Sequence, residues 1–157
     1  MTIWQLLLLA FIAVVSVPLC WIDVKQHRLP NSWVLPGYLV LIIAWGGQWC
    51  TTGEFPWLSL ATAGGYFLFL LALSFAGGMG MGDVKLAGVL GGAAGLLSLS
   101  VVVLSPVLAF VLGGLVSVGG LVIHWAGKKS RIPFGPFLIA GFWSGIFLAS
   151  YGFQFPI

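Results

Sequence analysis

The chain has 157 residues, of which six are basic, three are acidic and 61% are hydrophobic. An average soluble domain carries about 25% charged residues, so this composition excludes a water-soluble globule. Its richness in apolar residues also excludes a disordered chain. The net charge of +3 comes from basic residues in separate short stretches, whereas a nucleic-acid-binding surface needs a clustered basic face. We therefore expect one domain embedded in a lipid bilayer, with no nucleic-acid partner.

A membrane-spanning helix needs about 20 apolar residues, and six apolar stretches follow one another along the chain. They are 3–22, 33–49, 57–76, two within the uncharged stretch 86–125 with a turn near 97–106, and 134–151. The predicted fold is all-α, a polytopic membrane protein in which residues 1–157 form a single bundle of six transmembrane helices. Glycines at GxxxG spacing, such as Gly91 and Gly95, predict close packing between these helices.

The basic residues orient the predicted bundle. All six lie in the loops after the first, third and fifth spans: Lys25, Arg28, Lys85, Lys128, Lys129 and Arg131. The loop after the second span contains Glu54 and no basic residue. Cytoplasmic loops of membrane proteins carry an excess of Lys and Arg. We therefore expect the three basic loops on the cytoplasmic side and both termini outside.

The sequence gives no sign of a metal site. Cys20 and Cys50 do not form a CxxC pair, and two histidines without a cluster of further ligands do not indicate zinc. We expect neither a metal nor another cofactor, and no catalytic role for Glu54 in the outer loop.

The chain contains two aspartates, Asp23 and Asp83. Both lie at the predicted cytoplasmic ends of apolar spans, where an ionisable group is costly and often functional. Two carboxyl groups that share a site do not both ionise readily, so one keeps a proton and can act as an acid beside an ionised base. The alternative, in which each aspartate only caps a helix or meets a nearby lysine, stays open from the residue pattern alone.

Short runs of Gly and Pro surround these aspartates. Asp83 follows Gly80-Met-Gly82, and glycine permits a close approach of another backbone. Pro30 precedes the second span and Pro133 the last, where proline starts a helix cleanly. These runs either punctuate helices or bind substrate and shape a site. The candidates for the second role are Gly80, Gly82, Lys85, Pro30, Pro133, Phe134, Gly135 and Pro136.

With these motifs the chain resembles the type IV prepilin peptidases, membrane aspartic proteases of the GxGD class. The resemblance rests on three ordered runs: Asp23 followed by Leu29-Pro30-Asn31, Gly80-x-Gly82-Asp83-x-Lys85, and Ile132-Pro-Phe-Gly-Pro-Phe137. It implies that Asp23 and Asp83 are a catalytic pair. It also implies an endopeptidase in the cytoplasmic membrane that removes the short basic leader of type IV pilin-like precursors, after a glycine, at the cytoplasmic face.

One departure from the family pattern limits the implied activity. Many bacterial members carry a cytoplasmic insertion with CxxC motifs and an N-methyltransferase activity. Here the stretch between the first two predicted spans, 23–32, is short and the chain contains no CxxC. The resemblance therefore implies the short, peptidase-only type, with no methyltransferase activity and without zinc or S-adenosylmethionine.

Two functions of other classes are alternatives to the peptidase. A small transporter or channel could use the two aspartates as a proton or cation relay, but such proteins often place acids near the bilayer midplane and contain inverted repeats. A structural subunit of a pilus assembly would tolerate the loss of either aspartate. The three motifs together favour the peptidase.

Overall fold

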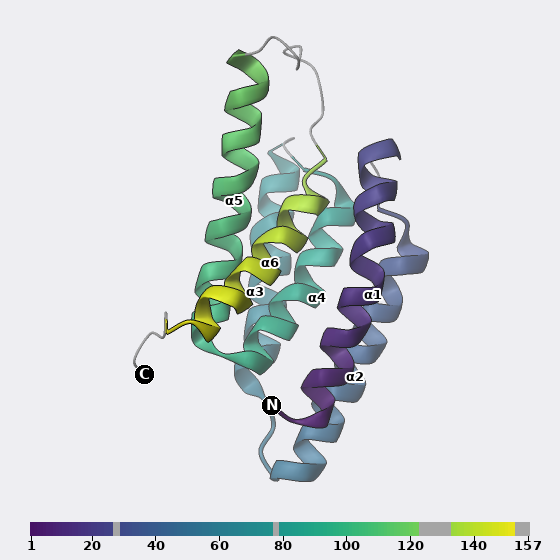
Figure 1. The fold of residues 1–157 in the computed structure, drawn as a ribbon. Coiled ribbons are helices and arrows are strands. Elements are labelled where there is room, and N and C mark those ends of the chain that lie inside the picture. Colours follow the sequence, from purple (N-terminus) through teal and green to yellow (C-terminus); the bar gives the residue numbers. More distant parts are fainter. Residues whose placement is uncertain (27–28, 77–78, 123–132, 153–157) are drawn as a thin grey trace.

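The computed structural model describes residues 1–26, 29–76, 79–122 and 133–152, which form six helices (Figure 1). They are α1 (Ile3–Gln26), α2 (Asn31–Thr52), α3 (Trp57–Phe75), α4 (Met81–Leu97), α5 (Leu99–Val122) and α6 (Gly135–Ser150). The described residues include no strand. Helices α1, α2, α3 and α5 are long and apolar enough to cross a membrane, and α6 is shorter but also apolar. The all-α prediction is confirmed.

Two helices extend into stretches that were predicted to be loops. Helix α1 continues past Asp23 to Gln26, and Lys25 in its last turn interacts favourably with the negative end of the helix dipole. Helix α4 begins at Met81, so Asp83 lies in its first turn, where an acidic residue meets the positive end of the dipole. Both aspartates are thus held on helices, which fixes their side chains more firmly than a loop does.

The turn between α4 and α5 lies at Ser98, at the beginning of the predicted region 97–106. Ser98 is extended, with φ −170° and ψ 160°, and its hydroxyl accepts a hydrogen bond from the backbone N–H of Val101 at 3.3 Å. This is the arrangement of an N-cap residue. Pro106, which the sequence suggested as part of the turn, instead lies inside α5. Transmembrane helices tolerate proline because neighbouring groups satisfy the freed carbonyl.

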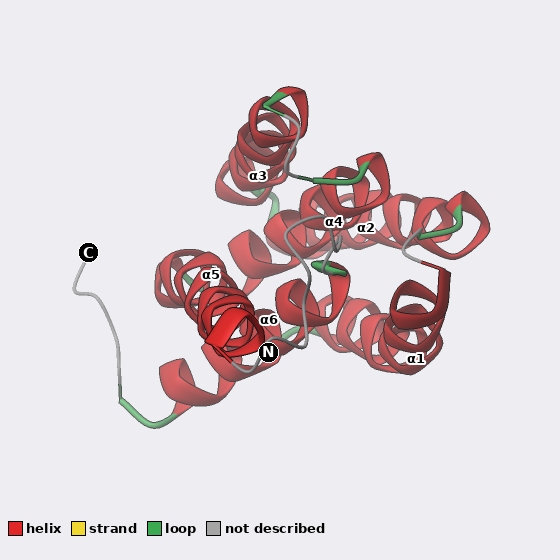
Figure 2. Cartoon of the chain, turned by 90° about the horizontal axis from the view of Figure 1, so that it is seen from above, coloured by secondary structure: helices red, strands yellow, loops and turns green. Residues whose placement is uncertain are grey.

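Helix α4 lies in the middle of the bundle and is buried on most of its surface. Viewed from above, α4 lies in the centre of the bundle, and α6 lies at one side between α5 and α1 (Figure 2). Small residues make this possible: a side chain at Gly91 would place its Cβ 2.5 Å from the carbonyl oxygen of Thr62 on α3. Helix α3 packs mainly on α4, and α5 packs mainly on α6.

The alternating direction of the helices brings four helix ends together. The end of α1 and the beginnings of α2, α4 and α6 all lie at the same end of the bundle (Figure 1). These are the segments that carry Asp23, Asn31, Asp83 and Gly135. The fold therefore gathers the three sequence motifs at one end of the protein.

Candidate active site

Asp23 lies in the last turn of α1 and is only 4% exposed. Its Oδ2 accepts a hydrogen bond from the backbone N–H of Gly135, at 3.0 Å. Gly135 is the first residue of α6, where backbone N–H groups have no partner inside the helix. A Cβ at position 135 would stand 2.7 Å from the same Oδ2. The carboxylate thus occupies the space that any other residue at position 135 would fill.

Asp83 lies in the first turn of α4 and is 8% exposed. It lies outside the four long apolar helices. Burial, together with the negative charge of Asp23, raises the pKa of the Asp83 carboxyl, and a backbone hydrogen bond from Gly80 opposes that shift. Its Oδ1 is buried and has no hydrogen-bond partner among the described residues. The two aspartates, 60 positions apart in sequence, therefore share one electrostatic environment, and one oxygen of Asp83 is left for a ligand.

Leu29 packs between the beginnings of α4 and α6. A Cβ at Gly82 would lie 2.7 Å from the Leu29 Cβ, and one at Gly135 would lie 3.3 Å from the Leu29 Cδ1. Leu29 is buried, and Pro30 follows it in an extended conformation at the start of α2. No sequence pattern marked Leu29 as a site residue. Its only signal was its place in the Leu-Pro-Asn run.

Lys85 points toward α2. Its Nζ donates a hydrogen bond to Oδ1 of Asn31, the first residue of α2, at 3.0 Å. Its backbone carbonyl accepts a hydrogen bond from the hydroxyl of Tyr38, at 2.8 Å. Both bonds tie α2 to the beginning of α4. No sequence pattern pointed to Tyr38, because it lies inside an apolar span.

The last motif surrounds the beginning of α6. Phe134 immediately precedes the helix, and its ring lies 5.2 Å from that of Phe110 on α5. Pro136 lies in the first turn, where its missing N–H costs no intrahelical bond. Pro133, Phe134 and Pro136 are each half-buried. They form one side of the end of the bundle that holds the aspartates.

Several residues from the sequence analysis lie outside the described part of the chain. They are His27, Arg28, His124, Lys128, Lys129, Arg131 and Ile132. Glu54 is exposed and follows α2, at the end of the bundle opposite the aspartates. Among the described residues, no group of three or more His, Cys, Asp or Glu side chains could hold a metal ion.

Fold and site together define a multi-pass membrane protein with two buried carboxyl groups at one end of its helix bundle. Residues 6–118 match the type IV leader peptidase family. The chain belongs to this family, as its motifs suggested.

Curated relatives agree with this assignment. The chain is 36% identical over 148 residues to a protein named prepilin leader peptidase/N-methyltransferase from Pseudomonas putida, with 85% of this chain and 49% of that protein covered. Proteins of the same name from Stutzerimonas stutzeri and Burkholderia pseudomallei (strain 1026b) are 36% and 37% identical, with 83% and 76% of this chain and 47% and 39% of theirs covered. The chain thus spans about half the length of the P. putida and S. stutzeri relatives, and less of the B. pseudomallei relative. No solved structure matches it.

Proposed function

We propose that this protein is an aspartic endopeptidase that removes the leader of type IV prepilin-like proteins at the cytoplasmic face of the membrane, with Asp23 and Asp83 as the catalytic pair. One observation carries the proposal. Two buried carboxyl groups from separate motifs lie close enough to interact electrostatically; one accepts the N–H of Gly135, and the other has an oxygen without a partner among the described residues. The proposal concerns leader cleavage alone.

The surroundings of the two carboxyl groups suggest different roles. Asp23 accepts a backbone N–H at the positive end of a helix, which stabilises negative charge. Asp83 is buried and lies beside that charge, which favours its protonated form. We assign Asp23 as the general base and Asp83 as the general acid. The pair nevertheless titrates as a unit, so the assignment describes the form of the pair that begins the reaction.

Peptide hydrolysis then needs no covalent intermediate. Asp23 takes a proton from a water molecule, whose oxygen attacks the scissile carbonyl carbon, and Asp83 gives its proton to the carbonyl oxygen. The resulting diol collapses as Asp83 recovers a proton from a hydroxyl and Asp23 gives its proton to the leaving nitrogen. Both carboxyl groups return to their starting states.

The cytoplasmic location rests on charge. Lys25 and Lys85 lie at the same end of the bundle as the aspartates, and basic residues favour the cytoplasmic side. A basic leader would remain there in water, while the apolar helix of the precursor stays in the bilayer. The scissile bond would then reach the membrane surface at the level of the two aspartates.

Cleavage of a co-expressed type IV prepilin tests the proposal. Asp23→Asn and Asp83→Asn should each abolish the mobility shift that accompanies leader removal, since each removes an ionisable group of the pair. Glu54→Gln, which changes an exposed acid at the opposite end, should cleave like the wild type at equal membrane levels. Cleavage that survives either aspartate change would contradict the catalytic pair and would fit a structural role.

A further inference from the structure

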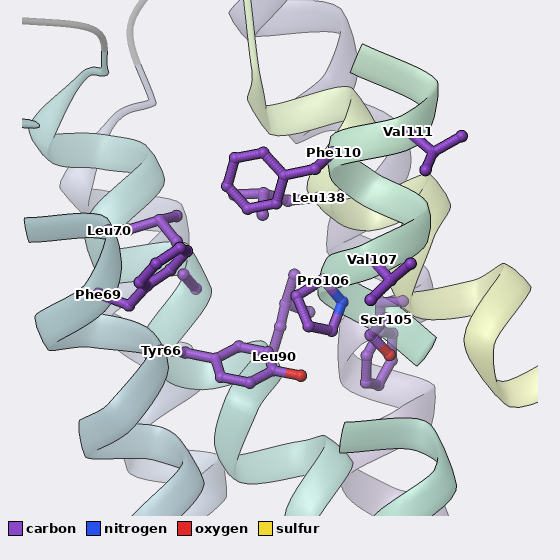
Figure 3. Close-up of a pocket in the computed structure, with 12 residues that line it drawn as sticks. Tyr66, Phe69, Leu70, Leu90, Ser105, Pro106, Val107, Phe110, Val111 and Leu138 are labelled. Atoms are coloured by element: carbon purple, nitrogen blue, oxygen red, sulfur yellow. The ribbon is translucent and has the colours of Figure 1, made fainter. Parts of the chain in front are cut away.

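A cavity of about 540 Å³ lies between α3, α4, α5 and α6 (Figure 3). Its walls are almost entirely apolar. Of its two hydroxyl-bearing residues, Tyr66 donates its hydroxyl to the carbonyl oxygen of Val102. Ser105 is buried, and its hydroxyl has no partner among the described residues. A charged ligand in this cavity would lose its hydration without compensation, so the cavity suits an apolar occupant.

The cavity begins one helical turn from the aspartate site. Ala87 lines it and follows Asp83 by four residues, a spacing that places both on one face of α4. Leu138 lines it and follows Gly135 by three residues on α6. The ring of Phe110, which also lines the cavity, lies 5.2 Å from that of Phe134 beside the site. The cavity therefore begins about one helical turn from the site on both α4 and α6.

The cavity also faces the side of the bundle. Helices α3 and α5 each pack mainly on another helix, and two side-chain contacts bridge them. These are the hydrogen bond from Tyr66 to Val102 and the ring pair Phe69–Phe110, whose centroids are 5.9 Å apart. On the α5 rim, Val107 is 52% exposed. An apolar chain in the bilayer would therefore approach the cavity from this side, between α3 and α5, where these two contacts would have to part.

We propose that this cavity binds the first turns of the apolar helix of the prepilin substrate, immediately after the scissile bond, and that this helix enters sideways between α3 and α5. The inference rests on the proposed function. The apolar walls exclude the basic leader, which must then lie on the other side of the aspartates. A volume of about 540 Å³ holds several large side chains but not a whole membrane-spanning helix, which is about 10–12 Å wide and 30 Å long.

Val107→Trp tests the cavity because it fills the rim from the lipid side without disturbing a buried residue. The matched control is Val14→Trp, on the lipid-facing side of α1 and 72% exposed. We expect Val107→Trp to lower kcat/KM for a full-length prepilin about tenfold, mainly through KM, since one large apolar side chain loses its burial. A soluble peptide that ends just after the cut should be cleaved equally by the wild type and both variants.

A photo-crosslinker identifies the occupant directly. With p-benzoylphenylalanine in place of Val107, in an Asp83→Asn background that traps substrate, we expect an adduct to the apolar segment after the cut and none from position 14. Adducts to lipid alone would overturn the inference in favour of an acyl chain. Equal substrate adducts from both positions would also overturn it, because the contact would not be specific to the cavity.

The two proposals fail in different ways. If the aspartate variants still cleave, the proposed function fails whatever the cavity binds. If both aspartate variants are inactive but Val107→Trp cleaves full-length prepilin at the wild-type rate, only the cavity assignment fails.

Discussion

Gly135 positions the carboxylate of Asp23 in two ways: its backbone N–H donates a hydrogen bond, and its lack of a side chain leaves room for the carboxylate. The N–H donates to Asp23 Oδ2, and that oxygen lies where a Cβ would be. Gly135→Ala should therefore displace the Asp23 carboxylate, and a displacement of about 1 Å costs about 100-fold in rate. Cleavage of a prepilin by purified variants measures this loss.

The control for this change is Gly64→Ala on α3. A Cβ at Gly64 meets nothing within 4 Å, so the added methyl group should leave cleavage unchanged. Equal activity in the two alanine variants would show that the position of Asp23 does not depend on Gly135.

The buried carboxyl of Asp83 makes the stability of the protein depend on pH. An unfolded aspartate loses its proton near pH 3.9, whereas burial and the charge of Asp23 raise the pKa of Asp83 in the folded protein. Between these two pKa values the folded state binds more protons, so its free energy of unfolding falls as pH rises. The Asp83→Asn variant has no carboxyl group to ionise at this position, so it does not lose stability in this way as pH rises. It should therefore unfold at a higher temperature than the wild type at pH 8.

Thermal unfolding in detergent at pH 5 and pH 8 measures this effect. The difference in Tm between Asp83→Asn and the wild type should be larger at pH 8. Glu54→Gln serves as the control, because Glu54 is exposed. A difference that shrinks as pH rises would mean that the Asp83 carboxylate is stabilised in the fold, and the proposed acid role would be wrong.

At the scale of elements, α2 is tied to α4 by polar bonds at the end that holds the site. Tyr38 donates to the Lys85 carbonyl and Lys85 donates to Asn31. Tyr38→Phe should lower the free energy of unfolding by about 1 kcal/mol, the usual net contribution of a hydrogen bond. It should also reduce cleavage, because the beginning of α4 carries Asp83. Chemical unfolding in micelles and prepilin cleavage give the two readouts.

Thr51→Val is the control at the other end of α2. Its hydroxyl donates to two carbonyl oxygens of its own helix, those of Gly47 and Gln48, so its loss should leave cleavage unchanged. If Tyr38→Phe matched this control in both stability and activity, α2 would not help to position α4.

At the scale of the whole molecule, the proposed orientation places the aspartates inside the cell and the α2–α3 turn outside. Cys50 is exposed in the last turn of α2. In spheroplasts, a membrane-impermeant maleimide should therefore label the wild type without permeabilisation and should not label Cys50→Ser. Labelling of Cys50 only after permeabilisation would reverse the orientation and place the aspartates outside.

The sequence alone was sufficient for the all-α class and the order of the six helices. A bilayer requires apolar stretches of a set length that satisfy their own backbone hydrogen bonds, and such stretches can be read locally from the sequence. The family, too, was accessible from three short motifs. Helix ends were less well predicted. Asp83 proved to lie in the first turn of α4, where the dipole stabilises an acidic residue, and α1 continues past Asp23 to include Lys25, where the dipole stabilises a basic residue.

Only the tertiary structure decided how the motifs meet. The hydrogen bond between Gly135 and Asp23 joins residues 112 positions apart, and Leu29 packs against both Gly82 and Gly135. The cavity likewise depends on four helices at once. Apolar periodicity tells which residues avoid water, but in a bilayer almost every residue of a span does so. Which of them face a partner helix, a cavity or lipid is settled by the close approach of whole helices, and no single stretch of sequence contains that information.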